Sequence, residues 1–264
     1  MGSSEGLTGA EKAIQIASKD GSWVVLQNLH LSPDWIEGLE KLIESLQAHH
    51  SFRLFFTISL AASVPVTLLR TSRILTFERA AGIQSSMRQS LEGVSAFDMS
   101  KLPVERARLY YLLSWVHSII VERLNFVPLG WSKTYAFNAS DFESGLFVID
   151  KWIDDESKNR TNISPSAIPW KALRTLIINT VYGGKIDISD DEIKTHPIVN
   201  RAFSKDAYSL GYELVEGESL SVVPEENDRE SIFKWIDRLP ERESPRWLGL
   251  EEDAEESMMK ILSK

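Results

Sequence analysis

The order of apolar patterns along the chain changes at about Gly82, and this change limits the folds that the chain can adopt. Before Gly82, helical spacing alternates with short apolar runs, an order that is typical of parallel strands separated by helices. The strand-like runs are residues 23–26, 52–58 and 74–77. After Gly82 the strand signal disappears, and the helical patterns lie at residues 83–91, 103–124, 140–155 and 169–182. The sequence therefore predicts an α/β part followed by an all-α part.

The run at residues 23–26 is bounded by Gly21 before and by polar residues after, which predicts a fully buried parallel strand. It ends in Gln27 and Asn28. In a P-loop ATPase such a strand ends in an acid that holds Mg²⁺, often with a second acid that orients water. An amide has no charge to hold a hard cation and cannot take a proton. The residues alone leave open whether this is a nucleotide site that has lost its chemistry or was never one.

Composition excludes several classes of function. The net charge of −9 argues against a nucleic-acid surface, because such a surface needs clustered Lys and Arg. The absence of Cys removes disulfides, thiolate catalysis and Cys-based zinc sites, and the five His show no metal-binding spacing. The longest apolar stretch, residues 109–121, is interrupted by polar residues and too short to span a bilayer. We therefore expect a soluble chain that binds neither nucleic acid nor membrane.

The sequence offers no recognisable catalytic motif. The one Gly-Lys pair, Gly184-Lys185, is followed by Ile186 and does not form a phosphate-binding loop, and no Gly-x-Ser-x-Gly elbow occurs. Acidic residues are abundant, but their spacing singles out no pair for acid–base chemistry. We therefore assign no catalytic residue, no metal ligand and no cofactor.

One short motif places two arginines three residues apart: Pro65-Val-Thr-Leu-Leu-Arg-Thr-Ser-Arg-Ile74. It resembles the Leu-Leu-Arg-x-x-Arg segment of AAA+ ATPases, which precedes the last strand of the large subdomain. The resemblance implies that Arg70 and Arg73 correspond to arginines that reach the γ-phosphate held by a neighbouring subunit. Thr57 then falls where the family's polar sensor residue ends the preceding strand. The alternative reading is that both arginines are surface residues in a turn.

Longer segments resemble the C-terminal part of the dynein heavy chain. They are residues 23–35, 105–117, 122–133, 168–174, 182–187 and 245–250. Gly130-Trp-Ser-Lys133 and Gly184-Lys-Ile-Asp187 are similar to the cytoplasmic type of that family. The resemblance implies the sixth AAA+ module of the motor ring, a module that in this family neither binds nor hydrolyses ATP. Gln27 and Asn28 are then the degenerate positions of the metal-binding and water-orienting acids.

The resemblance also implies a division into three parts. Residues 1–80 would be a partial AAA+ large α/β subdomain, residues 81–200 a helical small (lid) subdomain, and residues 201–264 a mixed C-terminal extension with an acidic terminal helix. Trp115 and Trp170 would be buried anchors of the small subdomain. The chain would be a fragment that lacks the upstream strands of its module. In an AAA+ sheet one missing strand lies between the strands at 52–58 and 74–77. We therefore expect the isolated chain either to dimerise or to pair these two strands directly.

The implied function is that of a non-catalytic structural and force-transmitting module of a microtubule minus-end-directed motor. Its partners would be neighbouring AAA+ modules, dynein complex subunits and the microtubule. It would be located in the cytoplasm, in association with the cytoskeleton. Arg70 and Arg73 would contact the fifth module. Arg106 and Arg108, near the start of a lid helix, would be salt-bridged or solvated. Two alternatives stay open: a carboxylate-dependent hydrolase, and a free-standing helical interaction module.

Overall fold

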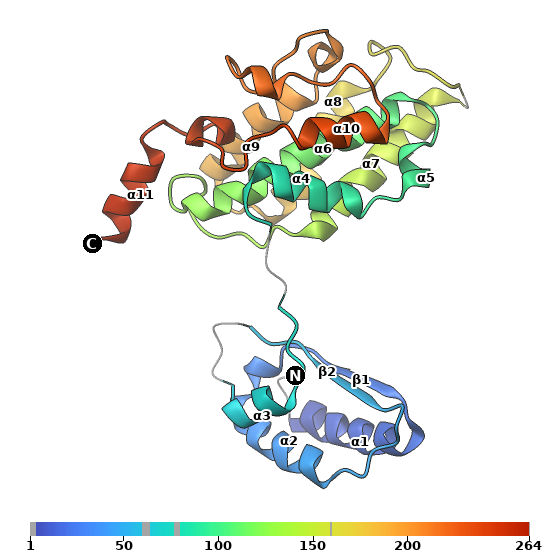
Figure 1. The fold of residues 1–264 in the computed structure, drawn as a ribbon, viewed down its shortest axis with the longest axis vertical. Helices are drawn as coiled ribbons and strands as arrows, with labels where there is room; N and C mark the ends of the chain where they lie inside the picture. Colours follow the sequence, from blue (N-terminus) through green and yellow to red (C-terminus); the bar gives the residue numbers. More distant parts are fainter. Residues whose placement is uncertain (1–3, 60–63, 77–79, 159, 264) are drawn as a thin grey trace. The chain divides into compact units, whose positions relative to one another are not determined.

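The computed structural model describes residues 4–59, 64–76, 80–158 and 160–263. It divides into two units, Met1–Glu78 and Arg79–Lys264 (Figure 1). The first unit contains both described strands, and the second is built from helices and short helical turns. No helix within the described ranges is both long and apolar enough to cross a membrane.

The first unit has the predicted order of helices and parallel strands. Its elements are α1 (Ser4–Asp20), β1 (Trp23–Leu26), the 3₁₀ turn Leu29–Leu31, α2 (Pro33–Ser45), β2 (Arg53–Phe56) and α3 (Val66–Thr71). The two strands pair in parallel, from Trp23 opposite Arg53 to Leu26 opposite Phe56. A parallel pair needs a crossover connection, and α2 supplies it. The parallel pairing of the first two predicted strands is therefore confirmed, with β2 shorter than expected.

The two faces of this small sheet differ. Because side chains alternate along a strand, one face carries Val24, Leu26, Leu54 and Phe56, which join an apolar cluster with residues of α1 and α2. On the other face Trp23 is 70% exposed and Val25 57% exposed. The prediction of a fully buried strand is wrong, since only Leu26 is buried in β1. The described helices of this unit cover one face of the sheet, so the opposite apolar side chains stay in solvent.

The third predicted strand, at residues 74–77, is absent over its described part. Residues 74–76 have no strand structure, Ile74 and Leu75 are exposed, and Phe77 lies outside the described residues. A strand is defined by its hydrogen bonds to a neighbour, and none of the described residues pairs with this segment. An apolar run alone does not supply that neighbour. Direct pairing of this segment with the strand at 52–58, one of the two expected outcomes, is therefore absent for residues 74–76, and dimerisation stays a prediction.

The second unit is built around one buried helix, α6 (Glu105–Glu122). The other α-helices are α4 (Gly82–Glu92), α5 (Ala96–Met99), α7 (Ala139–Ser157), α8 (Trp170–Leu176), α9 (Ser189–Ala202), α10 (Arg229–Ile236) and α11 (Ala254–Leu262). A π-helical turn, Ile177–Tyr182, continues α8, and 3₁₀ turns lie at Arg123–Phe126, Gly183–Lys185, Lys205–Tyr208, Ser219–Ser221 and Pro245–Leu248. Helices α4, α7 and α9 pack directly on α6 (Figure 1).

Helix α6 is buried on all sides, whereas its sequence predicts one broad apolar face. From Arg106 to Glu122 every residue is buried. A helix in this position must satisfy its own polar side chains, and Ser114 and Ser118 do so by donating to the carbonyl oxygens of Tyr111 and Ser114. The central helix is therefore enclosed by chain segments on every side.

The C-terminal residues complete this core. Trp235 and Trp247 pack on Trp115 of α6, with ring centroids 6.1 and 5.9 Å apart. Glu213 and Val222 form an antiparallel bridge in the connecting segment. Trp115 is only 2% exposed, as its predicted role as a core anchor requires. The segment after α9 is thus part of the same packed body.

Candidate functional site

The carboxyl edge of the two strands brings together the polar residues that the sequence singles out. Gln27 and Asn28 follow β1, and Thr57 follows β2. The Asn28 backbone N–H donates to Thr57 Oγ1 at 2.8 Å, and the Thr57 N–H donates to the Leu26 carbonyl at 3.0 Å. These bonds extend the strand pairing by one residue and fix the edge. The structure therefore places Asn28 and Thr57 in contact, while their assigned roles stay predictions.

The chemistry of this edge does not suit a magnesium–nucleotide complex. Hard cations such as Mg²⁺ prefer carboxylate oxygens, and Gln27 and Asn28 supply neutral amides. Asn28 has a left-handed backbone (φ 55°, ψ 47°), which asparagine tolerates better than most residues, and its N–H is already bound to Thr57. Within the described ranges no group of three or more His, Cys, Asp or Glu side chains could hold a metal ion. The residues present do not fit the metal-bound nucleotide of an active ATPase.

The arginine motif lies on a separate short helix. Leu68 buries the inner side of α3 in the apolar cluster, while Arg70 lies in its last turn and Arg73 just after it. Both arginines are exposed. Neither guanidinium forms a hydrogen bond or ion pair within the part of the chain that the structure describes, so both cations face solvent, one in α3 and one just after it. The structure shows no bond between them and the strand edge.

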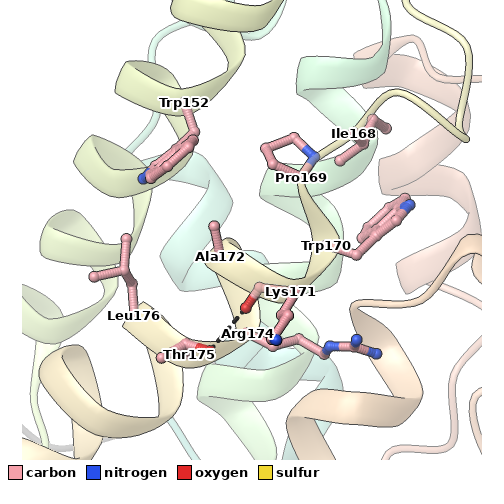
Figure 2. A pocket seen from close by; sticks show the side chains of 9 residues that line it. All are labelled: Trp152, Ile168, Pro169, Trp170, Lys171, Ala172, Arg174, Thr175 and Leu176. Atoms are coloured by element: carbon pink, nitrogen blue, oxygen red, sulfur yellow. Dashed lines mark hydrogen bonds between the residues drawn. The ribbon is translucent and has the colours of Figure 1, made fainter.

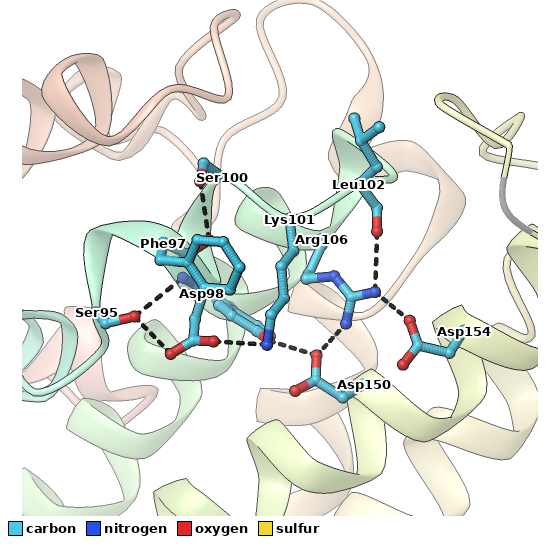
Figure 3. Close-up of polar contacts among 10 residues, drawn as sticks. Ser95, Phe97, Asp98, Ser100, Lys101, Leu102, Arg106, Asp150 and Asp154 are labelled. Atoms are coloured by element: carbon cyan, nitrogen blue, oxygen red, sulfur yellow. Dashed lines mark hydrogen bonds and ion pairs between the residues drawn. The ribbon is translucent and has the colours of Figure 1, made fainter.

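In the second unit, Arg106 is held by acids of α7 (Figure 3). It is 2% exposed, forms ion pairs with Asp150 and Asp154, and donates to the Leu102 carbonyl at 3.1 Å. Tyr110 also donates to Asp150. Burial lowers the pKa of Arg106, but the hydrogen bonds that it donates to both aspartates outweigh burial and raise that pKa overall. Arg106 therefore joins α6 to α7 and is not free to sense a phosphate.

Arg108 joins α6 to the C-terminal segment instead. It donates to Asn227 Oδ1 at 2.8 Å and to the carbonyl oxygens of Ala207 and Pro224. Its guanidinium lies 4.8 Å from the ring centroid of Tyr208. Burial lowers the pKa of Arg108. Arg106 and Arg108 thus both hold α6 to other segments. Sequence reasoning missed their partners, although the spacing of Asp150 and Asp154, one helical turn apart, is a signal for the site that binds Arg106.

Asp191 is a third tie that the sequence does not reveal. Its side chain is 0% exposed and accepts from the Ser132 backbone and hydroxyl, the Tyr135 hydroxyl and the Lys194 ammonium. Burial raises the pKa of this carboxyl, and the bonds from Lys194, Tyr135 and Ser132 together lower it below its usual value. The first turn of α9 is thereby fixed to the segment Gly130-Trp-Ser-Lys133.

An apolar groove of about 790 Å³ lies on the outer side of α7 and α8 (Figure 2). Trp152 and Trp170 flank it, and Lys171 and Arg174 add positive charge at its lining. Trp170 is only half-buried, so the expectation that it is a buried anchor is wrong, although it packs against the core. Its indole N–H donates to the Pro165 carbonyl at 2.7 Å.

The fold and the strand edge together define the class. A pair of parallel strands with polar residues at their carboxyl edge, followed by an all-helical unit, is a partial AAA+ module. Residues 1–76 match the model described as dynein heavy chain region D6 P-loop domain. Residues 106–254 match the model described as dynein heavy chain AAA lid domain. The chain belongs to the dynein heavy chain family, as the sequence resemblance predicts.

Relatives of known identity are similar along almost the whole chain. The cytoplasmic dynein heavy chain of Dictyostelium discoideum is 43% identical over 259 residues, which is 98% of this chain and 6% of that protein. Those of Fusarium vanettenii and Drosophila melanogaster are 44% and 42% identical, again over 98% of this chain and 6% of theirs. The chain therefore spans about 6% of the length of the relatives it matches.

Proposed function

We propose that the chain is a structural, force-transmitting AAA+ module of a cytoplasmic dynein heavy chain, a microtubule minus-end-directed motor, and has no ATP turnover of its own. One observation carries the absence of turnover: the strand edge holds amides where an active ATPase needs acids, and the Asn28 N–H is already bound to Thr57. The relatives, named as cytoplasmic dynein heavy chains, support the motor and the cytoplasmic location. Association with the cytoskeleton follows from the same proposal.

The partners belong to the same proposal. They are the neighbouring AAA+ modules, with dynein complex subunits and the microtubule reached through the rest of the heavy chain. The exposed guanidiniums of Arg70 and Arg73 and the apolar groove beside Trp152 and Trp170 are surfaces suited to such modules, because each leaves charged or apolar surface open to solvent. We also propose the three-part division at residues 1–80, 81–200 and 201–264.

Force transmission needs a body that does not deform under load. Arg106 ties α6 to α7, Arg108 ties α6 to the C-terminal segment, and Asp191 ties α9 to the segment before α7. Each tie uses a charged group buried among hydrogen-bond partners, and such groups favour one arrangement of the chain, since any other leaves a buried charge unpaired. The second unit, Arg79–Lys264, is thus suited to move as one piece.

The alternative of a carboxylate-dependent hydrolase finds less support. The carboxyls of Asp150 and Asp154 both bind Arg106. A second pair, Glu122 and Glu243, accepts the backbone N–H groups of Gly82 and Ile83 at the start of α4. Burial raises the pKa of Glu243. Both pairs therefore have structural duties that account for their positions.

Calorimetry of the 264-residue chain with Mg-ATP tests the proposal. We expect no saturable heat at micromolar nucleotide, and the same for the double variant Gln27→Glu, Asn28→Asp, because two acids do not create a phosphate cradle. In a heavy chain that contains this segment, Gln27→Ala with Asn28→Gly should leave microtubule-stimulated ATP turnover unchanged. Glycine keeps the left-handed backbone of Asn28. A specific micromolar nucleotide site in the 264-residue chain would contradict the proposal. A loss of turnover in the heavy chain with Gln27→Ala and Asn28→Gly would also contradict it.

A further inference from the structure

A second pocket, of about 310 Å³, opens beside α6 where the C-terminal segment crosses it. Its lining includes Trp115 of α6 and Trp247 of the turn Pro245–Leu248, both almost fully buried. Ile119 and Leu214 add aliphatic surface. A volume near 300 Å³ is at the lower end of the range for small-molecule sites. The pocket can therefore hold one or two fused rings.

Three arginines line the same pocket: Arg123, Arg201 and Arg246. Among the described residues that line it, Glu216 is the one acid. Its side chain is 86% exposed, and its oxygen lies 3.8 Å from Arg201 Nη1, the long end of an ion pair. Two positive charges remain unmatched within the lining, in a chain whose net charge is −9. Such a concentration of cations attracts an anion.

Arg123 supplies charge from the inner wall. It is 4% exposed, and donates to the Leu248 carbonyl at 2.7 Å and the Gly130 carbonyl at 3.0 Å. Its guanidinium lies 5.1 Å from the ring centroid of Trp131. Burial lowers its pKa to about 10, which leaves the group charged at neutral pH. Neutral carbonyls hold this cation in place, and the carboxylate of Asp191, which is not part of the pocket lining, also attracts it.

Arg201 and Arg246 are held in the same way nearer the mouth. Arg201 donates to the Glu213 carbonyl at 3.1 Å, and its buried Nε has no acceptor in the described structure. Arg246 donates to the Glu216 carbonyl at 2.8 Å. Gly217, at φ +78°, lets this guanidinium approach, since a Cβ there would lie 3.3 Å from Arg246 Nη2. A guanidinium has five N–H donors, so both arginines keep further Nη donors that an anion in the pocket can engage.

We propose that this pocket binds a small organic anion, with an apolar body against the lining residues of α6, α9 and the turn Pro245–Leu248 and a carboxylate or phosphate bound by Arg201 and Arg246. The guanidinium fork matches both anions, since each offers two oxygens in one plane. This site is distinct from the strand edge, which lies in the other unit. Its occupation does not depend on nucleotide turnover.

Calorimetry with ligands that share one ring system tests the pocket. The probes are 1-naphthyl phosphate, 1-naphthoate and the neutral 1-naphthalenemethanol, each titrated into the 264-residue chain. We expect an anion to bind at least about tenfold more tightly than the alcohol, because one charged hydrogen bond is worth that much. The tighter binder of the phosphate and the carboxylate shows which anionic group the pocket prefers.

Charge-removing variants locate the site. Arg201→Gln and Arg246→Gln should each weaken the anion at least about tenfold and leave the alcohol unchanged. Arg242→Gln is the matched control: its side chain is 86% exposed and lies outside the pocket lining, so anion affinity should stay the same. Circular dichroism of each variant verifies folding. Equal affinity for the alcohol, binding of none of the three probes, or an unchanged affinity in both pocket variants would overturn the proposal.

Discussion

His117 makes the stability of the second unit depend on pH. It is 5% exposed in the middle of α6, and its Nδ1 lies 3.1 Å from the Tyr182 hydroxyl. Burial lowers the pKa of His117 from 6.5 to about 4, with opposing smaller effects from Asp141 and Lys185, which form an ion pair at 2.7 Å. The folded protein therefore keeps this imidazole neutral, because charging it would place a cation among apolar side chains.

The sign and size of the effect follow from linkage. The folded pKa lies below the unfolded one, so between about pH 6.5 and pH 4 the unfolded chain binds a proton that the folded chain does not. Stability is therefore lost as the pH falls through this window. One pKa unit corresponds to about 1.4 kcal/mol, and the expected loss from this residue between neutral pH and pH 5 is about 2 kcal/mol.

Urea unfolding of the chain and of His117→Asn at pH 7.5 and pH 5 measures this loss. The Asn amide can still reach the Tyr182 hydroxyl but does not titrate, so the variant should lose about 2 kcal/mol less than the natural chain between the two pH values. His196→Asn, at an exposed position, controls for the removal of a histidine. If the natural chain and His117→Asn lose the same free energy, the reasoning about the buried neutral imidazole is refuted.

Three further predictions concern packing and exposed surface. Trp115→Ala should lower the free energy of unfolding by about 3–5 kcal/mol, and an unchanged melting temperature would contradict the central place of this ring. Asp191→Asn should lower the free energy of unfolding by about 3 kcal/mol, because Lys194 and the Ser132 and Tyr135 donors lose their ionised acceptor. Thermal unfolding measures this loss, and a loss below about 1 kcal/mol would argue against the tie. We expect the uncovered face of the sheet to cause self-association, so replacing the exposed Trp23 by Ser should lower the particle mass that light scattering measures. An unchanged particle mass would show that this face does not cause self-association.

The sequence predicts well what depends on neighbours along the chain. Three helices follow from local periodicity, and each is present. They begin at or near Gly82, Pro103 and Ser140. The parallel pairing of β1 with β2 also follows, because a helical pattern separates the two apolar runs. These features need only the order of elements along the chain.

What the sequence does not predict depends on distant residues. Arg106 finds Asp150 across 44 positions, and Arg108 finds Asn227 across 119, so nothing near either arginine distinguishes it from a solvated one. The strand predicted at residues 74–77 fails for the related reason that its apolar pattern carries no information about a pairing partner. The arginines of the second pocket likewise come from three separate segments.

The link between Arg108 and the C-terminal segment also has a consequence for how the chain folds during synthesis. Helix α6 leaves the ribosome well before the acceptors at Ala207, Pro224 and Asn227 and the rings of Trp235 and Trp247. Until those residues emerge, Arg108, Tyr111 and Trp115 of α6 lack these partners, and loop closure over so many residues is slow. The nascent helix then exposes the surface that chaperones bind, and the lid reaches its final packing in one late step.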